Sequence, residues 1–535
     1  MPVMTGGDVV VKALADQGIR KVFSCPGGQF LPIYDALREH PDTELIVPRH
    51  EGAAALMACG YSLATGKPAS VMTTVGAGVV YEASGLLLAW RERLPVISIA
   101  PQVQSYRMKP IQESLQACDQ DEIFRTFTKF RAILYHYDRM PDLIARSIRM
   151  ACAPEPGPIH LDVPVDVIFE YKKLRGKSMK KVFPSGLTRY DGEVHPDPGA
   201  TSKAAEAIMS SIRPVVLAGR GVERARAGIE LGELCEMASM KAIVSTAAFS
   251  CLPALANSGL GLAVDWSDEE GLSILANADL LVLIEADEET ARLASALMSR
   301  SPSIKVVQSA ALSASVGSVV PVEHSLVGTP SSVLSGMARE ASGKRHDRDT
   351  EWMETLSGRA SSLYDDRPEK LSGPRETNMA AAMKAVSEYA GSEDFVVCDG
   401  PLVCSVAARA LRLKTPHRSL LIPGDEIPGA GLPLSHGIKA ALPDSNVFLF
   451  SDTDRMKRHH RELQTQARYG LGVSTFLFQA AETRPDHEVD FSHLSRSLGV
   501  KSEKMMDSSE ELSSHKLEEA VSDKRGFVFD LSEGL

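Results

Sequence analysis

Glu51 is the residue whose place in the sequence best suits acid–base chemistry. It follows an apolar run from Leu45 to Val47 and begins a segment rich in small residues that continues to Gly60. The run predicts a buried strand, and the segment predicts a helix whose small residues would let another backbone approach closely. The positive end of a helix favours an ionised carboxylate, whereas burial favours a protonated one, so Glu51 could be tuned for proton transfer. The alternative is a structural acid that caps the helix.

Three glycine-containing motifs lie around this segment. They are Pro26–Gly28, Thr74–Gly78 and Gly157–Pro164. Together with the Glu51 segment, their residue types, order and spacing resemble the first domain of thiamine-diphosphate (ThDP) enzymes of the acetolactate synthase, pyruvate oxidase and 2-oxo acid decarboxylase group. The resemblance implies that Glu51 is the glutamate that activates the cofactor. It also implies a cofactor cleft lined by Pro26, Gly27, Gly28, Thr74, Gly76, Gly78 and Tyr81.

The resembled family binds the cofactor diphosphate through Mg²⁺ in its third domain, and this chain departs from the family pattern there. The family motif is Gly-Asp-Gly followed by an Asn-Asn pair, where this chain has Ser451–Thr453 and Gln479–Ala480. Asp452 is the retained metal ligand, but Ala480 offers no side-chain oxygen. Because Mg²⁺ requires near-octahedral oxygen coordination, one carboxylate makes a poor site, with Asp454 as an alternative ligand.

Two further cofactor contacts of the third domain are altered. Pro401 removes a backbone donor from the turn that holds the diphosphate in the family. Pro428 stands where a bulky apolar residue usually bends the cofactor, and Asp425 and Glu426 place two acids where the family has small residues. The sequence therefore predicts that ThDP and Mg²⁺, the cofactors of the family, are not bound in the conventional way.

The altered cleft offers candidate catalytic residues and candidate anion-binding residues. Carboxylates that face one another can form an acid–base pair, because each raises the pKa of the other. The catalytic candidates are Glu51, Asp425, Glu426 and Gln112, the last resembling the substrate-side glutamine of the family. The candidates for binding a substrate anion are Arg49, Arg455, Arg458 and His459. The last three belong to a basic helix-forming segment, for which the alternative is a solvated surface helix.

The elements that position these residues are predicted to form α/β domains. Apolar strands without strict alternation, separated by helices, indicate parallel sheets covered on both faces. The resemblance implies a three-domain ThDP-enzyme-like architecture in which each domain is a parallel sheet covered by helices. The predicted segments are an N-terminal pyrimidine-binding-like domain (1–171), a linker (172–200), a central domain (201–342), a second linker (343–376) and a C-terminal diphosphate-binding-like domain (377–535).

The composition is that of an ordinary globular enzyme. The 535 residues are 44% hydrophobic and 24% charged, and the formal net charge of −11 gives no reason to expect nucleic-acid binding. No apolar run approaches the length of a membrane span, and the first residues lack the basic-then-apolar order of a signal peptide. The eight cysteines show neither metal-ligand nor disulfide spacing, so we expect a cytoplasmic protein with reduced cysteines.

Some members of the resembled family hold FAD in the central domain. The glycine turn Gly219–Gly221 is more typical of a plain strand-to-helix connection than of a nucleotide site. The later positions that contact a nucleotide in the family, here Glu285–Asp287 and Gln308–Ala310, lack the usual basic or ribose-binding pattern. FAD is therefore not expected.

These observations favour an acetolactate-synthase-like enzyme, a transferase or lyase that acts on a small 2-oxo acid or a related anionic metabolite. One alternative is a non-catalytic or half-site partner subunit of a related ThDP enzyme. Another is a genuine ThDP-dependent carboligase or decarboxylase with unusual metal ligands. Because the family builds its active sites between subunits, we expect a homodimer or homotetramer, or a hetero-oligomer with a related subunit.

Overall fold

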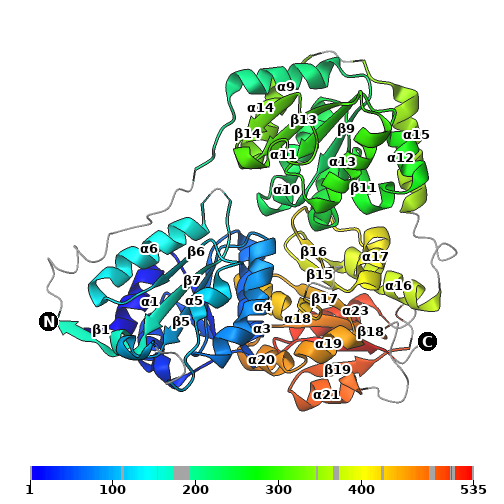
Figure 1. The fold of residues 1–535 in the computed structure, drawn as a ribbon. Helices are drawn as coiled ribbons and strands as arrows, with labels where there is room; N and C mark the ends of the chain where they lie inside the picture. The colour runs from blue at the N-terminus through cyan, green and yellow to red at the C-terminus, as the bar shows by residue number, and fades with distance from the viewer. Residues whose placement is uncertain are drawn as a thin grey trace.

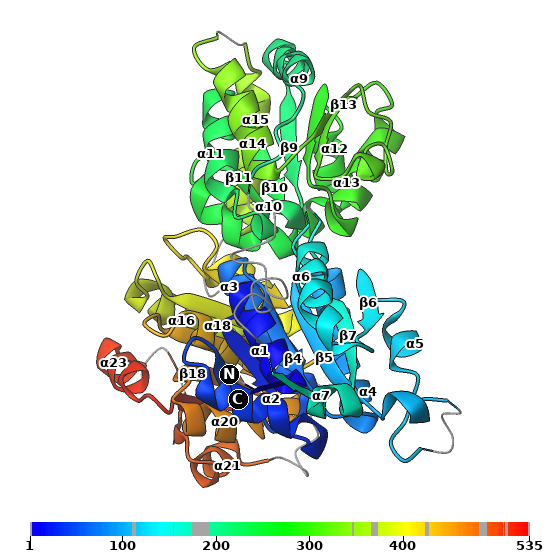
Figure 2. The same ribbon diagram turned by 90° about the vertical axis from the view of Figure 1, so that its left-hand side faces the viewer.

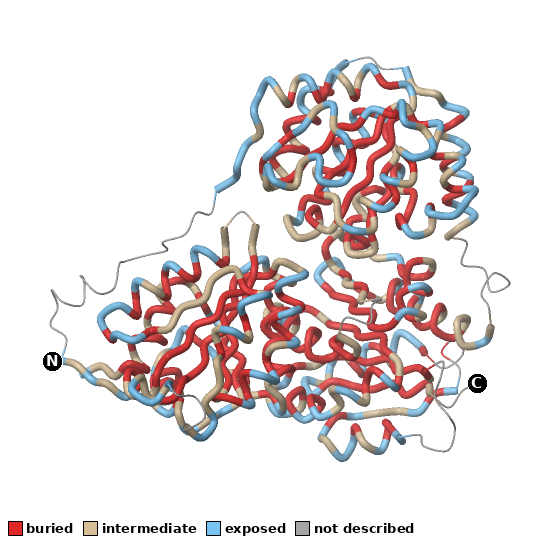
Figure 3. The backbone as a smooth tube through the Cα atoms, in the orientation of Figure 1, coloured by how far each residue is buried: buried red, intermediate tan, exposed pale blue. Residues whose placement is uncertain are grey.

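Three six-stranded sheets form the framework of the computed structural model, which describes residues 3–109, 114–153, 155–173, 192–344, 347–364, 373–422, 427–480, 489–506, 508 and 512–532. Each strand pairs in parallel with its neighbours in these sheets. Helices pack around each sheet, and the backbone of the strands is buried along most of its length (Figure 3). Burial on both faces explains the continuous apolar runs in the sequence and confirms the predicted α/β fold class.

The N-terminal domain occupies the lower left of Figure 1. Its strands follow the order β3-β2-β4-β5-β7-β6. They are β2 (Lys21–Ser24), β3 (Glu44–Ile46), β4 (Ala69–Met72), β5 (Val96–Gln102), β6 (Phe130–Ile133) and β7 (Ile159–Pro164). The helices are α1 (Gly6–Asp16), α2 (Leu31–Glu39), α3 (Glu51–Thr65), α4 (Ala77–Arg91), α5 (Gln120–Phe124), α6 (Met140–Ala151) and α7 (Val165–Phe169). A separate antiparallel ribbon pairs β1 (Val3–Thr5) with β8 (Tyr171–Lys173).

The central domain lies above the other two in Figure 1, with strand order β11-β10-β9-β12-β13-β14. The strands are β9 (Pro214–Ala218), β10 (Lys241–Val244), β11 (Gly259–Leu262), β12 (Leu280–Ile284), β13 (Lys305–Ala310) and β14 (His324–Val327). The helices include α9 (Pro198–Ser210), α10 (Arg220–Arg224), α11 (Gly228–Met237), the 3₁₀ segment η5 (Thr246–Leu255), α12 (Glu269–Leu275), α13 (Glu288–Arg300), α14 (Pro330–Ala341) and α15 (Thr350–Leu363).

The C-terminal domain has the strand order β16-β15-β17-β18-β20-β19. The strands are β15 (Phe395–Asp399), β16 (Ser419–Ile422), β17 (Val447–Asp452), β18 (Val473–Phe478), β19 (Lys501–Lys504) and β20 (Phe527–Leu531). The helices are α16 (Pro374–Tyr389), α17 (Pro401–Ala410), α18 (Gly431–Ala441), α19 (Thr453–His459), α20 (Glu462–Tyr469), α21 (Phe491–Ser497) and α23 (Ser514–Ser522).

Helices α3 and α18 join the N-terminal and C-terminal domains, and they lie side by side in both ribbon views (Figures 1 and 2). Two glycines allow this close approach. A Cβ atom on Gly60 would lie 2.1 Å from the carbonyl oxygen of Leu434, and one on Gly437 would lie 1.9 Å from that of Met57. The small residues that follow Glu51 thus serve the close backbone contact that the sequence predicts.

Candidate active site

Glu51 is the first residue of α3, but a neighbour caps the helix. The N-cap is His50, whose Nδ1 accepts a hydrogen bond of 3.1 Å from the backbone N–H of Gly52. The half-buried Glu51 carboxylate lies instead beside the glycine-rich turn before α4, because a Cβ atom on Gly78 would be 3.5 Å from Glu51 Oε1. The carboxylate therefore does not make the capping hydrogen bond of α3.

The glycine-containing motifs of the N-terminal domain meet around this turn. Thr74 Oγ1 donates to Gln29 Oε1 at 3.0 Å, and a Cβ atom on Gly27 would lie 2.5 Å from Thr74 Oγ1. Gly76 has a φ of 77°, a left-handed conformation that disfavours side chains. Of the cleft positions, the structure brings together Gly27, Thr74, Gly76 and Gly78, with Pro26 and Gly28 exposed next to Gly27 and the Tyr81 ring packed against that of His50.

A buried carboxylate that the sequence patterns had not indicated lies in the second turn of α4. Glu82 is fully buried, and its Oε2 accepts a hydrogen bond of 2.6 Å from Thr73 Oγ1. Burial raises the pKa of Glu82 to about 7. The sequence signal that could have identified it is a lone acid in the otherwise apolar stretch from Val79 to Tyr81 and from Leu86 to Leu88.

Buried polar side chains connect the sheet to the glycine-rich turn. Ser98 Oγ lies 2.8 Å from His160 Nδ1, and His160 Nε2 lies 3.1 Å from Asp162 Oδ1. Asp162 also accepts from the side chain of Gln120, whose amide oxygen accepts from the backbone N–H of Gly76. Ser98, His160 and Asp162 are at most 1% exposed, so a substrate cannot reach them and they do not form a nucleophilic triad. Their role is to fix the turn.

The C-terminal domain holds the segment that precedes Glu51. The Glu462 carboxylate on α20 accepts two hydrogen bonds, of 3.0 and 3.1 Å, from the backbone N–H of Arg49, and the Tyr469 hydroxyl accepts from the N–H of Val47 at 3.0 Å. Burial raises the pKa of Glu462 to about 7. The Arg49 backbone is thus fixed, whereas its side chain is exposed.

A guanidinium lies where the family resemblance implies a metal ion. Arg455 Nη1 is 3.2 Å from Asp399 Oδ1, and Arg455 Nε is 3.5 Å from Asp452 Oδ2. The Arg455 side chain is only 8% exposed. Asp452 also caps α19, because its Oδ1 accepts from the N–H of Arg455 at 3.0 Å. Burial raises the pKa of Asp399 to about 6, against the opposing effect of the Gly431 N–H and of Arg455.

The groups beside Arg455 do not fit a magnesium-bound diphosphate. Pro401 is the first residue of α17 and has no N–H to offer. Ala480 contributes only its backbone N–H, which donates to Thr453 Oγ1 at 3.1 Å. With a guanidinium on both carboxylates and no side-chain oxygen at 480, these residues offer Mg²⁺ a poor set of oxygen ligands.

The remaining predicted residues do not join this ion pair or lie outside the described residues. Arg458 is exposed on α19. Burial lowers the pKa of His459 to about 4, with the nearby His50 acting in the same direction, so His459 is neutral at pH 7 and a weak partner for an anion. Gln112, Asp425 and Glu426 lie outside the described residues.

A cavity of about 1140 Å³ lies where the three domains meet. Acidic and basic side chains both line its walls, and several of them already form ion pairs or hydrogen bonds with neighbouring groups. Arg220 Nη1 is 3.1 Å from Glu92 Oε1, and the Asp287 carboxylate both caps α13 and accepts from the Arg220 N–H at 2.8 Å. The carboxyl end of β12 therefore presents acids to this cavity, while arginines line other parts of its wall, among them Arg91, Arg93, Arg224 and Arg226.

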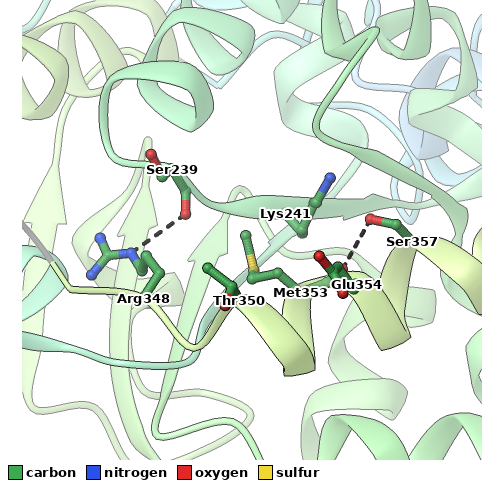
Figure 4. A pocket seen from close by; sticks show the side chains of 7 residues that line it. All are labelled: Ser239, Lys241, Arg348, Thr350, Met353, Glu354 and Ser357. Atoms are coloured by element: carbon green, nitrogen blue, oxygen red, sulfur yellow. Dashed lines mark hydrogen bonds between the residues drawn. The ribbon is translucent and has the colours of Figure 1, made fainter.

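A second cavity, of about 540 Å³, opens between β10 and α15 of the central domain (Figure 4). Its most prominent side chain is Arg348, which donates to the carbonyl oxygens of Ala238 at 2.7 Å and of Ile208 at 3.2 Å. These carbonyls lie at the C-terminal ends of α11 and α9, where a cation is favourable. Arg348 is thus a structural cap, and this cavity is separate from the Glu51 region.

Two family models match the chain. "Thiamine pyrophosphate enzyme, N-terminal TPP binding domain" matches residues 4–123, and "Thiamine pyrophosphate enzyme, central domain" matches residues 201–337. Thiamine pyrophosphate is another name for ThDP. These two matches confirm the predicted resemblance to the thiamine-diphosphate enzymes.

The chain is also similar to large subunits of acetolactate synthase. It is 26% identical over 484 residues to the isozyme 3 large subunit of Escherichia coli, covering 88% of this chain and 82% of the relative. It is 25% identical over 562 residues to a probable acetolactate synthase large subunit of Methanocaldococcus jannaschii, covering 99% and 92%. Among the described residues, none of the helices has the length and apolar character needed to cross a membrane.

Proposed function

We propose that this protein is an acetolactate-synthase-like enzyme that acts on a small 2-oxo acid or a related anionic metabolite, with Glu51 as its acid or base. The observation that carries the proposal is the placement of the Glu51 carboxylate. It lies beside Gly78 without capping α3, at the face of the N-terminal domain that α20 contacts. The backbone two residues before Glu51 is held by Glu462 of the C-terminal domain, and this placement between two domains supports a role in proton transfer to a bound ligand.

The surroundings of Glu51 support acid–base chemistry. The half-buried Cys25 thiol has its pKa raised first by burial and then by the charges of Glu51 and Glu462, which indicates that both carboxylates lie near this thiol. Glu82 and Glu462 have pKa values near 7, where a carboxyl group exchanges protons at little cost. We propose that the reaction forms or breaks a C–C bond, or is a decarboxylation or lyase reaction.

We further propose that the enzyme does not use ThDP and Mg²⁺ in the conventional way. The pairing of Arg455 with Asp399 and Asp452 supports this proposal, as do Pro401 and Ala480 at the neighbouring turns. A cytoplasmic protein fits the eight cysteines, all of which lie in described residues and outside any disulfide.

Two measurements test this function. Isothermal titration calorimetry of the full chain with ThDP and Mg²⁺ should give no metal-dependent binding in the micromolar range. The ThDP-free protein should turn over a member of a 2-oxo acid panel, and Glu51→Gln should lower that rate about 100-fold or more, while the exposed Glu39→Gln leaves it unchanged. Tight metal-dependent ThDP binding would indicate a conventional carboligase, and full activity of Glu51→Gln would remove Glu51 from the mechanism.

A second candidate function is that of a partner subunit that completes the active site of a related ThDP enzyme. The exposed apolar face of α4 favours it, because Val80, Tyr81, Leu87 and Trp90 are 51%, 53%, 38% and 41% exposed. Such a face usually packs against another chain. Co-purification of a related subunit whose activity depends on this chain would support the second function, whereas an active homodimer or homotetramer would support the first.

A further inference from the structure

Two carboxylates meet at the carboxyl edge of the C-terminal sheet. Asp399 ends β15 and Asp452 ends β17, and these strands are parallel neighbours in which Asp399 is in register with Ser451. Each carboxylate gives one oxygen to the backbone. Asp399 Oδ2 accepts from the N–H of Gly431 at 2.9 Å, and Asp452 Oδ1 accepts from the N–H of Arg455 at 3.0 Å. The remaining oxygens, Asp399 Oδ1 and Asp452 Oδ2, are the two that face Arg455.

The turn after β15 is shaped around the guanidinium. Gly400 has a φ of 133°, and a Cβ atom there would lie 3.0 Å from Asp452 Oδ2 and 3.1 Å from Arg455 Nε. Any larger residue would therefore press on both partners of the ion pair. The Arg455 backbone is packed closely as well, since a Cβ atom on Gly429 would lie 2.5 Å from its carbonyl oxygen, and the Arg455 side chain is only 8% exposed. The guanidinium is an enclosed part of the fold rather than a mobile surface group.

The charge balance explains why a cation must be present here. Asp399 is 1% exposed, and the Asp452 side chain is 18% exposed. Two such carboxylates without a counter-charge are costly, because burial removes their hydration and they repel one another. Arginine supplies this counter-charge at all ordinary pH values, because its guanidinium stays protonated. A divalent cation would meet the same need through the same two oxygens, so the guanidinium and the ion exclude one another.

We propose that Arg455 is a built-in cation that closes a divalent-cation site formed by Asp399 and Asp452. Replacing its guanidinium by a shorter, neutral side chain opens that site to Mn²⁺ or Mg²⁺. This inference deepens the proposed function. It rests on that function in one respect, namely that the carboxyl edge of the C-terminal sheet works without a bound metal. It adds that one side chain causes the exclusion, whereas Ala480 and Pro401 weaken the site without closing it.

Mn²⁺ titration of the full chain, followed by electron paramagnetic resonance, tests this proposal. The variants are Arg455→Met, which removes the charge but keeps an unbranched side chain, and Arg455→Lys, which keeps a charge. Arg455→Met should bind Mn²⁺ about tenfold or more tightly than either the unmodified protein or Arg455→Lys. Adding Asp399→Asn to Arg455→Met should abolish the gain. Equal binding by all three chains, or a gain that survives Asp399→Asn, would overturn the proposal.

The unmodified protein gives a second test if Arg455→Met does not fold. Millimolar Mn²⁺ should change its melting temperature by less than about 2 °C, because a ligand stabilises only a state that binds it. A larger rise that Asp452→Asn removes would show an open site and overturn the proposal. The proposed function fails separately, through metal-dependent ThDP binding by the unmodified chain. A negative result with Arg455→Met alone leaves that function standing.

Discussion

The backbone N–H of Arg49 donates to the carboxylate of Glu462, 413 residues further along the chain, at 3.0 and 3.1 Å. This contact joins the start of α3 to a helix of the C-terminal domain, so the position of Glu51 depends on how the two domains pack. We expect Glu462→Ala to lower the free energy of unfolding by about 1–3 kcal/mol, because it leaves a buried N–H without an acceptor.

Glu462→Gln is the matched control for that prediction. The amide oxygen of glutamine can still accept from Arg49, so its loss of stability should be smaller than that of Glu462→Ala. Urea denaturation of the three chains at pH 7 measures the difference. Equal destabilisation by both variants would contradict the view that the Arg49 hydrogen bond is what matters.

The buried Glu82 should make stability depend on pH. Its pKa in the folded chain, about 7, lies above the ordinary value of 4.5, so the folded state binds the proton more tightly. The stability that this carboxyl contributes is complete below pH 4.5 and is lost as the pH rises through 7, by up to about 3 kcal/mol. Glu462 acts in the same direction.

Glu82→Gln cannot ionise and should remove the Glu82 part of this dependence. We expect the difference in free energy of unfolding between the variant and the unmodified chain to move in favour of the variant from pH 4.5 to pH 8. Urea denaturation at several pH values measures it, with the exposed Glu39→Gln as control. A difference that stays constant across this range would contradict the raised pKa.

The contact between α3 and α18 should not tolerate a methyl group at its glycines. Gly60→Ala places a Cβ atom 2.1 Å from the Leu434 carbonyl, which forces the helices apart and should cost about 1–3 kcal/mol. Gly358 is the matched control, because it lies inside α15 with no atom within 4 Å of its Cβ position. Gly358→Ala should stabilise the chain by about 0.5–1 kcal/mol. Thermal denaturation compares the two, and a neutral Gly60→Ala would contradict the close packing.

The cluster of Glu223, Cys251 and His417 has ligand types that suit zinc, but its hydrogen bonds favour a metal-free state. The N–H of Gly228 donates to His417 Nε2 at 3.1 Å, so Nδ1 carries the ring proton and donates to Glu223 Oε2 at 2.6 Å. A metal on Nδ1 would have to displace that proton, leaving the Nε2–H opposite another donor. We expect Zn²⁺ to leave the melting temperature within about 1 °C. A larger rise that His417→Ala removes would show a metal site.

The exposed face of α4 should mediate association. Trp90→Glu places a charge among Val80, Tyr81 and Leu87 and should shift the assembly to a smaller species in light scattering after size exclusion. Ile229→Glu is the control, because Ile229 is 57% exposed in the central domain, away from α4. An unchanged mass for Trp90→Glu would show that subunits meet elsewhere.

The sequence by itself determined the fold class, because strands buried on both faces must be continuously apolar and alternate along the chain with helix-forming segments. The glycine-containing motifs and Glu51 could also be picked out from the sequence. A turn with a positive φ, as at Gly76, and a close backbone contact, as at Gly60, each restrict the residue types that can occupy the position. These constraints act within a few residues of the chain.

Only the tertiary structure decided which partners the charged groups have. In the sequence, Arg455 belonged to a basic helix that could bind a substrate anion, and nothing local showed that Asp399 lies 3.2 Å from its guanidinium. Glu82 stood in an apolar helix without a sign of its contact with Thr73. Charge pairing and burial depend on strands that are adjacent in the sheet but distant in the sequence. The pKa values, and the choice between a metal ion and a guanidinium, therefore follow only from the folded chain.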